Sequence, residues 1–123
     1  MKYVLLSNDP EIAEAARSPS AFPPSDTVAV HKDPEAALND CEGADMIFVD
    51  LLATLHDPHK IAGYEDFANK KMNHPVAKST PLVLIGAPDD YELDFMTGWP
   101  DFVFAHLRRP VTEKIFRRAS TWI

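Results

Sequence analysis

The residues of this sequence that could do chemistry each follow a short apolar run. Asp50 is a carboxylate joined directly to one such run, residues 7–9 (Ser-Asn-Asp) follow another, and Arg109 comes shortly after a third. Oxygen atoms of these types can surround a small hard cation, and a guanidinium can pair with a carboxylate through two parallel hydrogen bonds. A carboxylate that simply faces solvent at the end of a strand is the competing interpretation of Asp50.

These residues need a framework that brings distant segments together, and the apolar runs predict one. Five runs bounded by turn residues are expected to form strands, at residues 3–6, 27–30, 46–49, 82–85 and 102–105. The runs are apolar throughout instead of alternating, which is typical of parallel strands covered on both faces. In such sheets, ligands and reactive groups gather beyond the carboxyl ends of the strands, where Asp50, Gly86 and Arg109 would lie.

Segments that favour helices alternate with these strands. Residues 9–11 and 33–35 both have the sequence Asp-Pro-Glu, which combines an N-cap, a proline in the first helical position and an acid in the first turn. Further helices are expected around residues 64–72, in a long and irregular connection, and at 89–96 and 112–123. The alternation predicts a single α/β domain spanning residues 1–123, with a five-stranded parallel sheet between two layers of helices.

The composition excludes several classes of protein. The chain has 123 residues, of which 46% are hydrophobic and 25% charged, as in soluble globular domains. Its net charge of −7 argues against nucleic acid as the main partner, because nucleic-acid binding depends on neutralising phosphates. The apolar runs are too short to span a bilayer and the first of them ends too early for a signal peptide, so a cytoplasmic protein is expected.

The histidines and the single cysteine do not predict a metal site. His56 and His59 are the only close histidine pair, and Pro58 prevents a regular helix from presenting both rings on one face. A solvated loop explains them better than a metal. Cys41 excludes a disulfide within the chain and a thiolate-rich zinc site, and it is expected to pack near the end of the second helix.

Four segments of the chain resemble the receiver domain of bacterial two-component response regulators. They are the opening strand with its acidic turn and helix (residues 3–12), the strand before the phosphoaccepting aspartate (45–51), the fourth strand (81–87) and the Lys-Pro turn before the last helix (109–112). The resemblance covers essentially the whole chain and makes Asp50 the candidate phosphoacceptor. It implies a three-layer, flavodoxin-like fold with the strand order 2-1-3-4-5, and a cis Arg109–Pro110 peptide bond.

The sequence departs from the receiver pattern at most of the working positions. Where receivers carry a pair of acids after the first strand, this chain has Ser7 and Asn8; Gly86 replaces Ser or Thr, and Arg109 replaces Lys. Phosphoryl transfer to a carboxylate needs Mg²⁺ and a cation, because it brings negative charges together. We therefore expect that Asp50 does not accept a phosphoryl group efficiently, and no cofactor is predicted.

Two residues near Asp50 in the predicted fold each have two interpretations. Asp9 could approach Asp50 as a second carboxylate for a metal, or it could cap the helix that begins at Pro10, which explains it without a metal. Arg109 could hold Asp50 permanently through its planar fork, or it could face solvent beside Arg108.

Charges of opposite sign lie on the two sides of the last predicted strand. Four acids precede this strand, and three bases follow it on the last helix. They are Asp90, Glu92, Asp94 and Asp101, then Lys114, Arg117 and Arg118. Solvated faces are the ordinary explanation of such runs. The resemblance adds another, since receivers of transcription-factor type dimerise through the face formed by helix 4, strand 5 and helix 5. We expect this face to bind a second copy or another protein, and we expect no membrane partner.

Two hypotheses of different class follow. The first is a degenerate receiver, or pseudo-receiver, which is not an enzyme and signals through protein contacts in a two-component phosphorelay. The second is a working receiver that takes a phosphoryl group on Asp50 with the help of weakly bound Mg²⁺. A flavin or nucleotide binder of the same fold is disfavoured, because none of the four glycines belongs to a phosphate-cradling loop after a strand.

Overall fold

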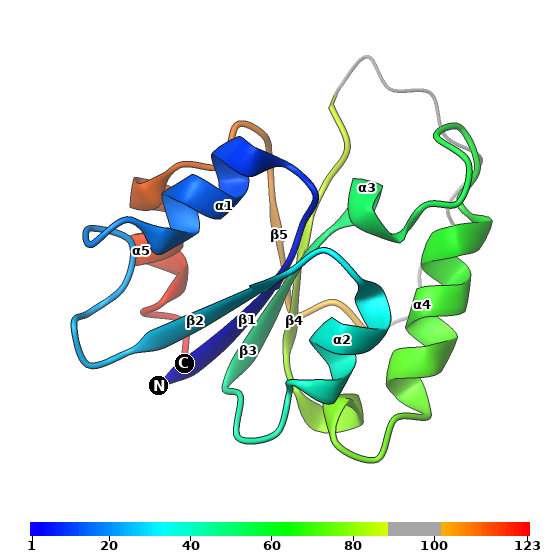
Figure 1. Cartoon of the computed structure of the whole chain (residues 1–123), viewed down its shortest axis with the longest axis horizontal. Helices are drawn as coiled ribbons and strands as arrows, with labels where there is room; N and C mark the ends of the chain where they lie inside the picture. Colours follow the sequence, from blue (N-terminus) through cyan, green and yellow to red (C-terminus); the bar gives the residue numbers. More distant parts are fainter. Residues whose placement is uncertain (89–101) are drawn as a thin grey trace.

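The computed structural model describes residues 1–88 and 102–123, which form a parallel sheet of five strands in the order β2-β1-β3-β4-β5. The strands are β1 Lys2–Leu6, β2 Thr27–His31, β3 Met46–Asp50, β4 Leu82–Ile85 and β5 Ala105–Leu107. The helices are α1 Pro10–Arg17, α2 Pro34–Asn39, α3 Leu51–Thr54, α4 Ala62–Met72 and α5 Glu113–Ala119, with a short 3₁₀ helix at Ala77–Ser79. Helices α1 and α5 cover one face of the sheet and α2, α3 and α4 the other (Figure 1). The predicted three-layer architecture and strand order are confirmed.

The two Asp-Pro-Glu segments begin helices as predicted. Asp9 Oδ1 accepts a hydrogen bond from the Glu11 N–H at 2.9 Å, and Asp33 Oδ2 accepts one from the Ala36 N–H at 3.0 Å. Each cap satisfies one of the N–H groups that have no partner at the start of a helix.

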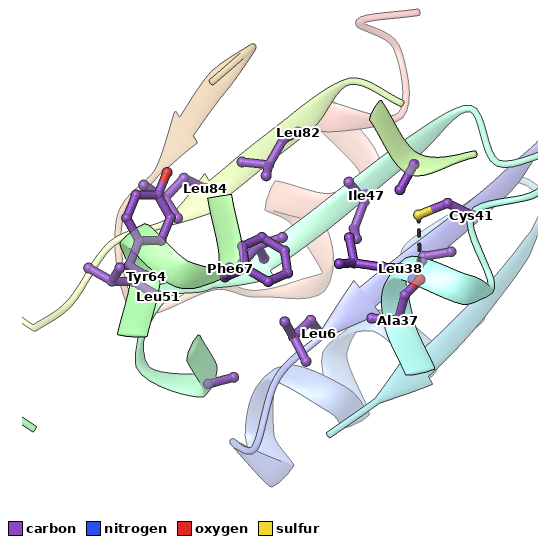
Figure 2. Packing of buried hydrophobic residues seen from close by; sticks show 14 of the residues in the cluster. Leu6, Ala37, Leu38, Cys41, Ile47, Leu51, Tyr64, Phe67, Leu82 and Leu84 are labelled. Atoms are coloured by element: carbon purple, nitrogen blue, oxygen red, sulfur yellow. Dashed lines mark hydrogen bonds between the residues drawn. The ribbon is translucent and has the colours of Figure 1, made fainter. Parts of the chain in front are cut away.

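The hydrophobic core has two halves, because successive residues of a strand point to opposite faces of the sheet. The half under α2, α3 and α4 is drawn in Figure 2, where Tyr64 and Phe67 of α4 lie over side chains of the sheet. Its buried strand residues are Val4, Leu6, Ile47, Val49, Leu82 and Leu84. The alternate strand residues, with Phe116 of α5, form the half under α1 and α5. Strands β1, β3 and β4 contribute buried side chains to both halves, so the centre of the sheet is held from both sides.

Cys41 packs at the end of α2, as predicted. Its side chain is buried, and Sγ donates a hydrogen bond to the Ala37 carbonyl oxygen at 3.4 Å (Figure 2). Burial raises the pKa of the Cys41 thiol, which makes it a small apolar residue rather than a nucleophile.

The fifth strand lies further along the chain than predicted. The sequence favours residues 102–105, whereas β5 is Ala105–Leu107, because Ala105 pairs with Val83 and Leu107 with Ile85 of β4. Phe102 and Val103 pack against the core from the segment before the strand, and 51% of the Phe104 surface is exposed. Pairing with β4 outweighs the apolar character of the earlier residues.

Two helical segments also differ from the prediction. The connection after β3 contains α3 and a 3₁₀ helix besides the expected α4. The last helix, predicted for residues 112–123, ends at Ala119, after which the chain turns and Trp122 packs back against the core. The helix predicted at 89–96 lies outside the described residues.

Candidate functional site

Polar side chains from three segments meet at the carboxyl edge of the sheet. Asp50 is the last residue of β3, Ser7 and Asp9 follow β1, and Arg109 lies between β5 and α5. Because the strands are parallel, their carboxyl ends lie side by side, and residues far apart in the sequence come into contact there. The sequence-predicted position of Asp50 at the end of a buried strand is confirmed.

The Asp50 carboxylate is buried, and both of its oxygens have partners. Its side chain is only 2% exposed. Oδ2 accepts a hydrogen bond from the Ser7 hydroxyl at 2.9 Å, and Oδ1 accepts one from the Leu52 N–H at 3.1 Å, which caps α3. Oδ1 also forms an ion pair with Nη2 of Arg109. A buried carboxylate needs a cation and donors of this kind, because burying an unpaired charge is costly.

Arg109 faces Asp50 and not solvent, which decides between the two interpretations left open by the sequence. Its guanidinium connects three segments: Nη2 pairs with Asp50, Nη1 lies 3.3 Å from Asp9 Oδ2, and Nε donates to the Gly86 carbonyl oxygen at 3.0 Å. Only 14% of the side chain is exposed. The Arg109–Pro110 peptide bond is cis, as predicted.

Asp9 performs the capping role foreseen for it and has a second role that the sequence did not reveal. Oδ1 caps α1, while Oδ2 forms the ion pair with Arg109. The Asp9 N–H in turn donates to the Ser7 hydroxyl at 3.0 Å. One aspartate therefore joins the first helix to the same guanidinium that holds Asp50.

Two of the positions at which the chain departs from the receiver pattern lie at the edge of this cluster. Asn8 is exposed and forms no hydrogen bond with Asp50, so Ser7 alone of the pair takes part. At Gly86, an added Cβ would meet nothing nearer than the Leu107 carbonyl oxygen at 3.8 Å. The hydroxyl that receivers carry at this position is absent, and the space for it remains.

The donor set does not fit Mg²⁺. The ion usually takes one or two carboxylates and several waters in an octahedral shell. Both carboxylates here, Asp50 and Asp9, already pair with Arg109, and a divalent cation between them would lie against its positive charge. Within residues 1–88 and 102–123, no group of three or more His, Cys, Asp or Glu residues could hold a metal.

The bases of the predicted interface lie on the exposed side of α5. Lys114, Arg117 and Arg118 are all exposed, and Arg117 Nε donates to the Ser20 carbonyl oxygen at 2.6 Å. The acids Asp90, Glu92, Asp94 and Asp101 lie outside the described residues. Binding through this face stays a prediction.

An acid or amide side chain contacts three of the histidines, which are His31, His56 and His74. His56 pairs with Asp66 at 3.3 Å in an exposed position, as a solvated segment predicts. His31, on β2, contacts Asp40 at 2.8 Å, and the hydrogen bond from His31, followed by that from Lys2, lowers the pKa of Asp40. Sequence reasoning missed this second cluster, because its members show no spacing that relates them.

A buried lysine is a further feature without a sequence signal. Lys71 on α4 is only 3% exposed, Nζ donates to the Thr80 carbonyl oxygen at 2.7 Å, and it lies 5.5 Å from the centre of the Phe102 ring. Burial lowers the pKa of the Lys71 ammonium. It anchors α4 to the chain before β4. The sequence did not indicate this burial, because a lysine near the end of a predicted helix is ordinarily exposed.

No helix in the described part of the chain is long and apolar enough to cross a membrane. No family model matches the sequence, and no curated protein does. Among solved structures, the crystal structure of the N-terminal domain of a response regulator receiver protein from Methanoculleus marisnigri JR1 is similar to this chain, with a TM-score of 0.57 and 13% identity over 96% of this chain and 91% of that one. At this identity the similarity shows the fold, which is that of a receiver domain.

Proposed function

We propose that the protein is a receiver-like signalling module of the two-component type that acts through protein contacts without phosphorylation of Asp50, and that it is not an enzyme. The observation that carries the proposal is the position of Arg109, whose guanidinium contacts Asp50, Asp9 and the Gly86 carbonyl oxygen together. The receiver fold supports the signalling class, and the geometry around Asp50 supports the absence of phosphorylation.

The contacts of Asp50 support the proposal that its carboxylate is a poor acceptor. The oxygens take bonds from Ser7, Leu52 and Arg109, so an attack on phosphorus has to break a buried ion pair first. The new phosphoryl group would also need Mg²⁺ to neutralise it, and the second carboxylate that residues 1–88 and 102–123 bring to this site, Asp9, faces the same guanidinium. Arg109 thus supplies permanently the positive charge that a metal supplies in a working site.

A working receiver remains the second candidate, because Asp50 stands at the carboxyl end of β3, where receivers carry their phosphoacceptor. Incubation of the full chain with acetyl phosphate and Mg²⁺, followed by intact-mass measurement, separates the two. We expect no phosphoryl adduct. Stoichiometric labelling that Asp50→Asn abolishes and the matched surface variant Asp57→Asn retains would establish the second candidate instead.

Restoring the receiver residues tests the same proposal from the other side. The variant Ser7→Asp, Asn8→Asp, Gly86→Thr and Arg109→Lys supplies the missing acids and hydroxyl and replaces the fork by a point charge. The space at Gly86 accommodates the new side chain, since only the Leu107 carbonyl oxygen lies within 4 Å of its Cβ. We expect Mg²⁺ binding to appear in this variant by calorimetry, and not in a variant with Gly86→Thr alone. Equal Mg²⁺ binding by the unaltered chain would contradict the proposal.

For the partner, we propose that the exposed bases of α5 contribute to a contact with a second copy or another protein. Reversal of Lys114 and Arg118 to Glu leaves the Arg117–Ser20 hydrogen bond intact, and reversal of Lys70 and Lys78, which lie on the opposite face of the sheet, is the matched control. We expect only the first pair to change association in sedimentation at several concentrations, and more strongly at low salt. Identical behaviour of the two double variants would exclude this surface.

A further inference from the structure

A cavity of about 400 Å³ opens beside the Arg109 cluster, where the start of α1, the end of β4 and the turn between β5 and α5 meet. This volume is within the range of about 300–1,000 Å³ found for small-molecule sites. Arg109 and Asp9 form the wall that the cavity shares with the Asp50 site. Asp50 does not line the cavity, and its other walls come from α1, residues 86–88 and residues 107–111.

One side of the cavity is apolar. Ile12, Leu107 and Val111 line it, and each has less than a tenth of its surface exposed, because their side chains belong to the core half under α1 and α5. Gly86 contributes no side chain, and a Cβ there would meet only the Leu107 carbonyl oxygen. An apolar group of a ligand could therefore be buried here without displacing any side chain.

The rim of the cavity carries two unpaired charges of opposite sign. Glu11, in the first turn of α1, and Arg108, directly after β5, both line the cavity and are exposed. Their side chains form no hydrogen bond or ion pair within residues 1–88 and 102–123, whereas the other charged residues of the lining, Asp9 and Arg109, pair with each other. The cavity thus offers one carboxylate and one guanidinium to a ligand, above an apolar floor.

We infer that this cavity binds a small zwitterion with an apolar body, of the class of the hydrophobic amino acids. The ligand's carboxylate would pair with Arg108, whose planar fork matches two oxygens, and its ammonium with Glu11. Its side chain would lie against Ile12, Leu107 and Val111. A simple anion or a simple cation would leave one of the two rim charges without a partner, so charge complementarity favours the zwitterion.

This inference does not depend on the proposed function, because the two residues that would pair with the charges of the ligand, Glu11 and Arg108, lie outside the Asp50 ion cluster. It can hold whether or not Asp50 is phosphorylated. The two failures are distinguishable, since one is measured as a phosphoryl mass and the other as binding of an amino acid.

The test is to titrate the full chain with phenylalanine and with leucine, and to measure binding by heteronuclear NMR and calorimetry. The matched half-molecules are 3-phenylpropionate, which lacks the ammonium, and phenethylamine, which lacks the carboxylate. We expect saturable binding of at least one amino acid, with shifts at Ile12, Leu107 and Val111, and weaker binding of both half-molecules. Each of Glu11→Gln and Arg108→Gln should weaken binding about tenfold, the loss expected for one hydrogen bond to a charged group.

Control variants and contrary outcomes are defined by the same geometry. Glu14→Gln and Arg17→Gln on α1 change equally exposed charges that do not line the cavity, and they should leave binding unchanged. Binding of 3-phenylpropionate as tight as that of phenylalanine would overturn the inference in favour of an anion site. Absence of saturable binding by both amino acids at millimolar concentration would overturn it altogether.

Discussion

Two ion clusters of this protein, one around Arg109 and one around Asp40, differ in burial. At the carboxyl edge, the side chains of Asp50 and Arg109 are 2% and 14% exposed. Elsewhere Lys2, at the start of β1, reaches Asp40 at 2.9 Å, and their side chains are 31% and 34% exposed. Both clusters have short contacts between opposite charges, so distance alone does not separate them.

Burial makes the members of the first cluster depend on one another. An exposed pair exchanges protein contacts for water when it breaks, and it contributes about 0–1 kcal/mol. A buried pair has no water to replace the lost partner, so removal of one member leaves an uncompensated charge at a cost of about 3–5 kcal/mol. The carboxyl edge is therefore expected to tolerate change poorly, although its chemistry departs most from the receiver pattern.

The largest loss of stability is expected from Arg109→Met. It leaves the buried Asp50 carboxylate without its cation, and we expect the free energy of unfolding in urea to fall by about 3–5 kcal/mol. The exposed neighbour substitution Arg108→Met is the control and should change stability by less than about 0.5 kcal/mol. The double variant Arg109→Met, Asp50→Asn should recover much of the loss, because the buried charge is gone. Equal stability of the two single variants would show that the ion pair is not formed.

A smaller effect is expected from Ser7→Ala. The Ser7 hydroxyl donates to Asp50 Oδ2 and accepts from the Asp9 N–H, so its removal leaves two groups short of a partner. Loss of a hydrogen bond to a buried charged group predicts a destabilisation of about 1–3 kcal/mol in urea unfolding. Ser25→Ala, on an exposed serine, is the comparison, and a loss at Ser7 no greater than that at Ser25 would contradict the buried network.

On the exposed cluster, Lys2→Met should cost no more than about 1 kcal/mol. The substitution removes the ion pair with Asp40 and keeps most of the apolar stem. We expect the difference from the unaltered chain to shrink as salt is added, because exposed charges are screened. A loss as large as that of Arg109→Met, insensitive to salt, would mean that exposure does not distinguish the two clusters.

The smallest effect concerns pH. The hydrogen bond from His31, followed by that from Lys2, lowers the pKa of Asp40, so the folded state favours the ionised carboxyl. Its stabilisation is fully present above the ordinary pKa of an aspartate and is lost as the pH falls through the lowered value. We expect unfolding free energies of the unaltered chain and Asp40→Asn to differ near neutral pH and to converge in acid. A difference that grows on acidification would reverse the sign of this contribution.

The sequence by itself determined most of the strands and helices and their order along the chain. The apolar runs predict four strands to within one residue, and the two Asp-Pro-Glu segments predict the starts of α1 and α2, because N-caps and first-turn prolines act over a few neighbouring residues. The fifth strand lies further along the chain than the sequence predicts, because its position depends on register against β4, which no local pattern encodes.

The tertiary structure decided how the site is connected. Arg109 pairs with Asp50, 59 residues away, and with Asp9, 100 residues away, so its orientation depends on how the sheet brings three segments together. The sequence placed Asp50, Asp9 and Arg109 at strand ends but left solvent as an equal partner for the guanidinium. Burial selects the ion pair, because a carboxylate at the end of a covered strand has no water to bind in place of the guanidinium. Burial is a property of the assembled layers and not of any one segment.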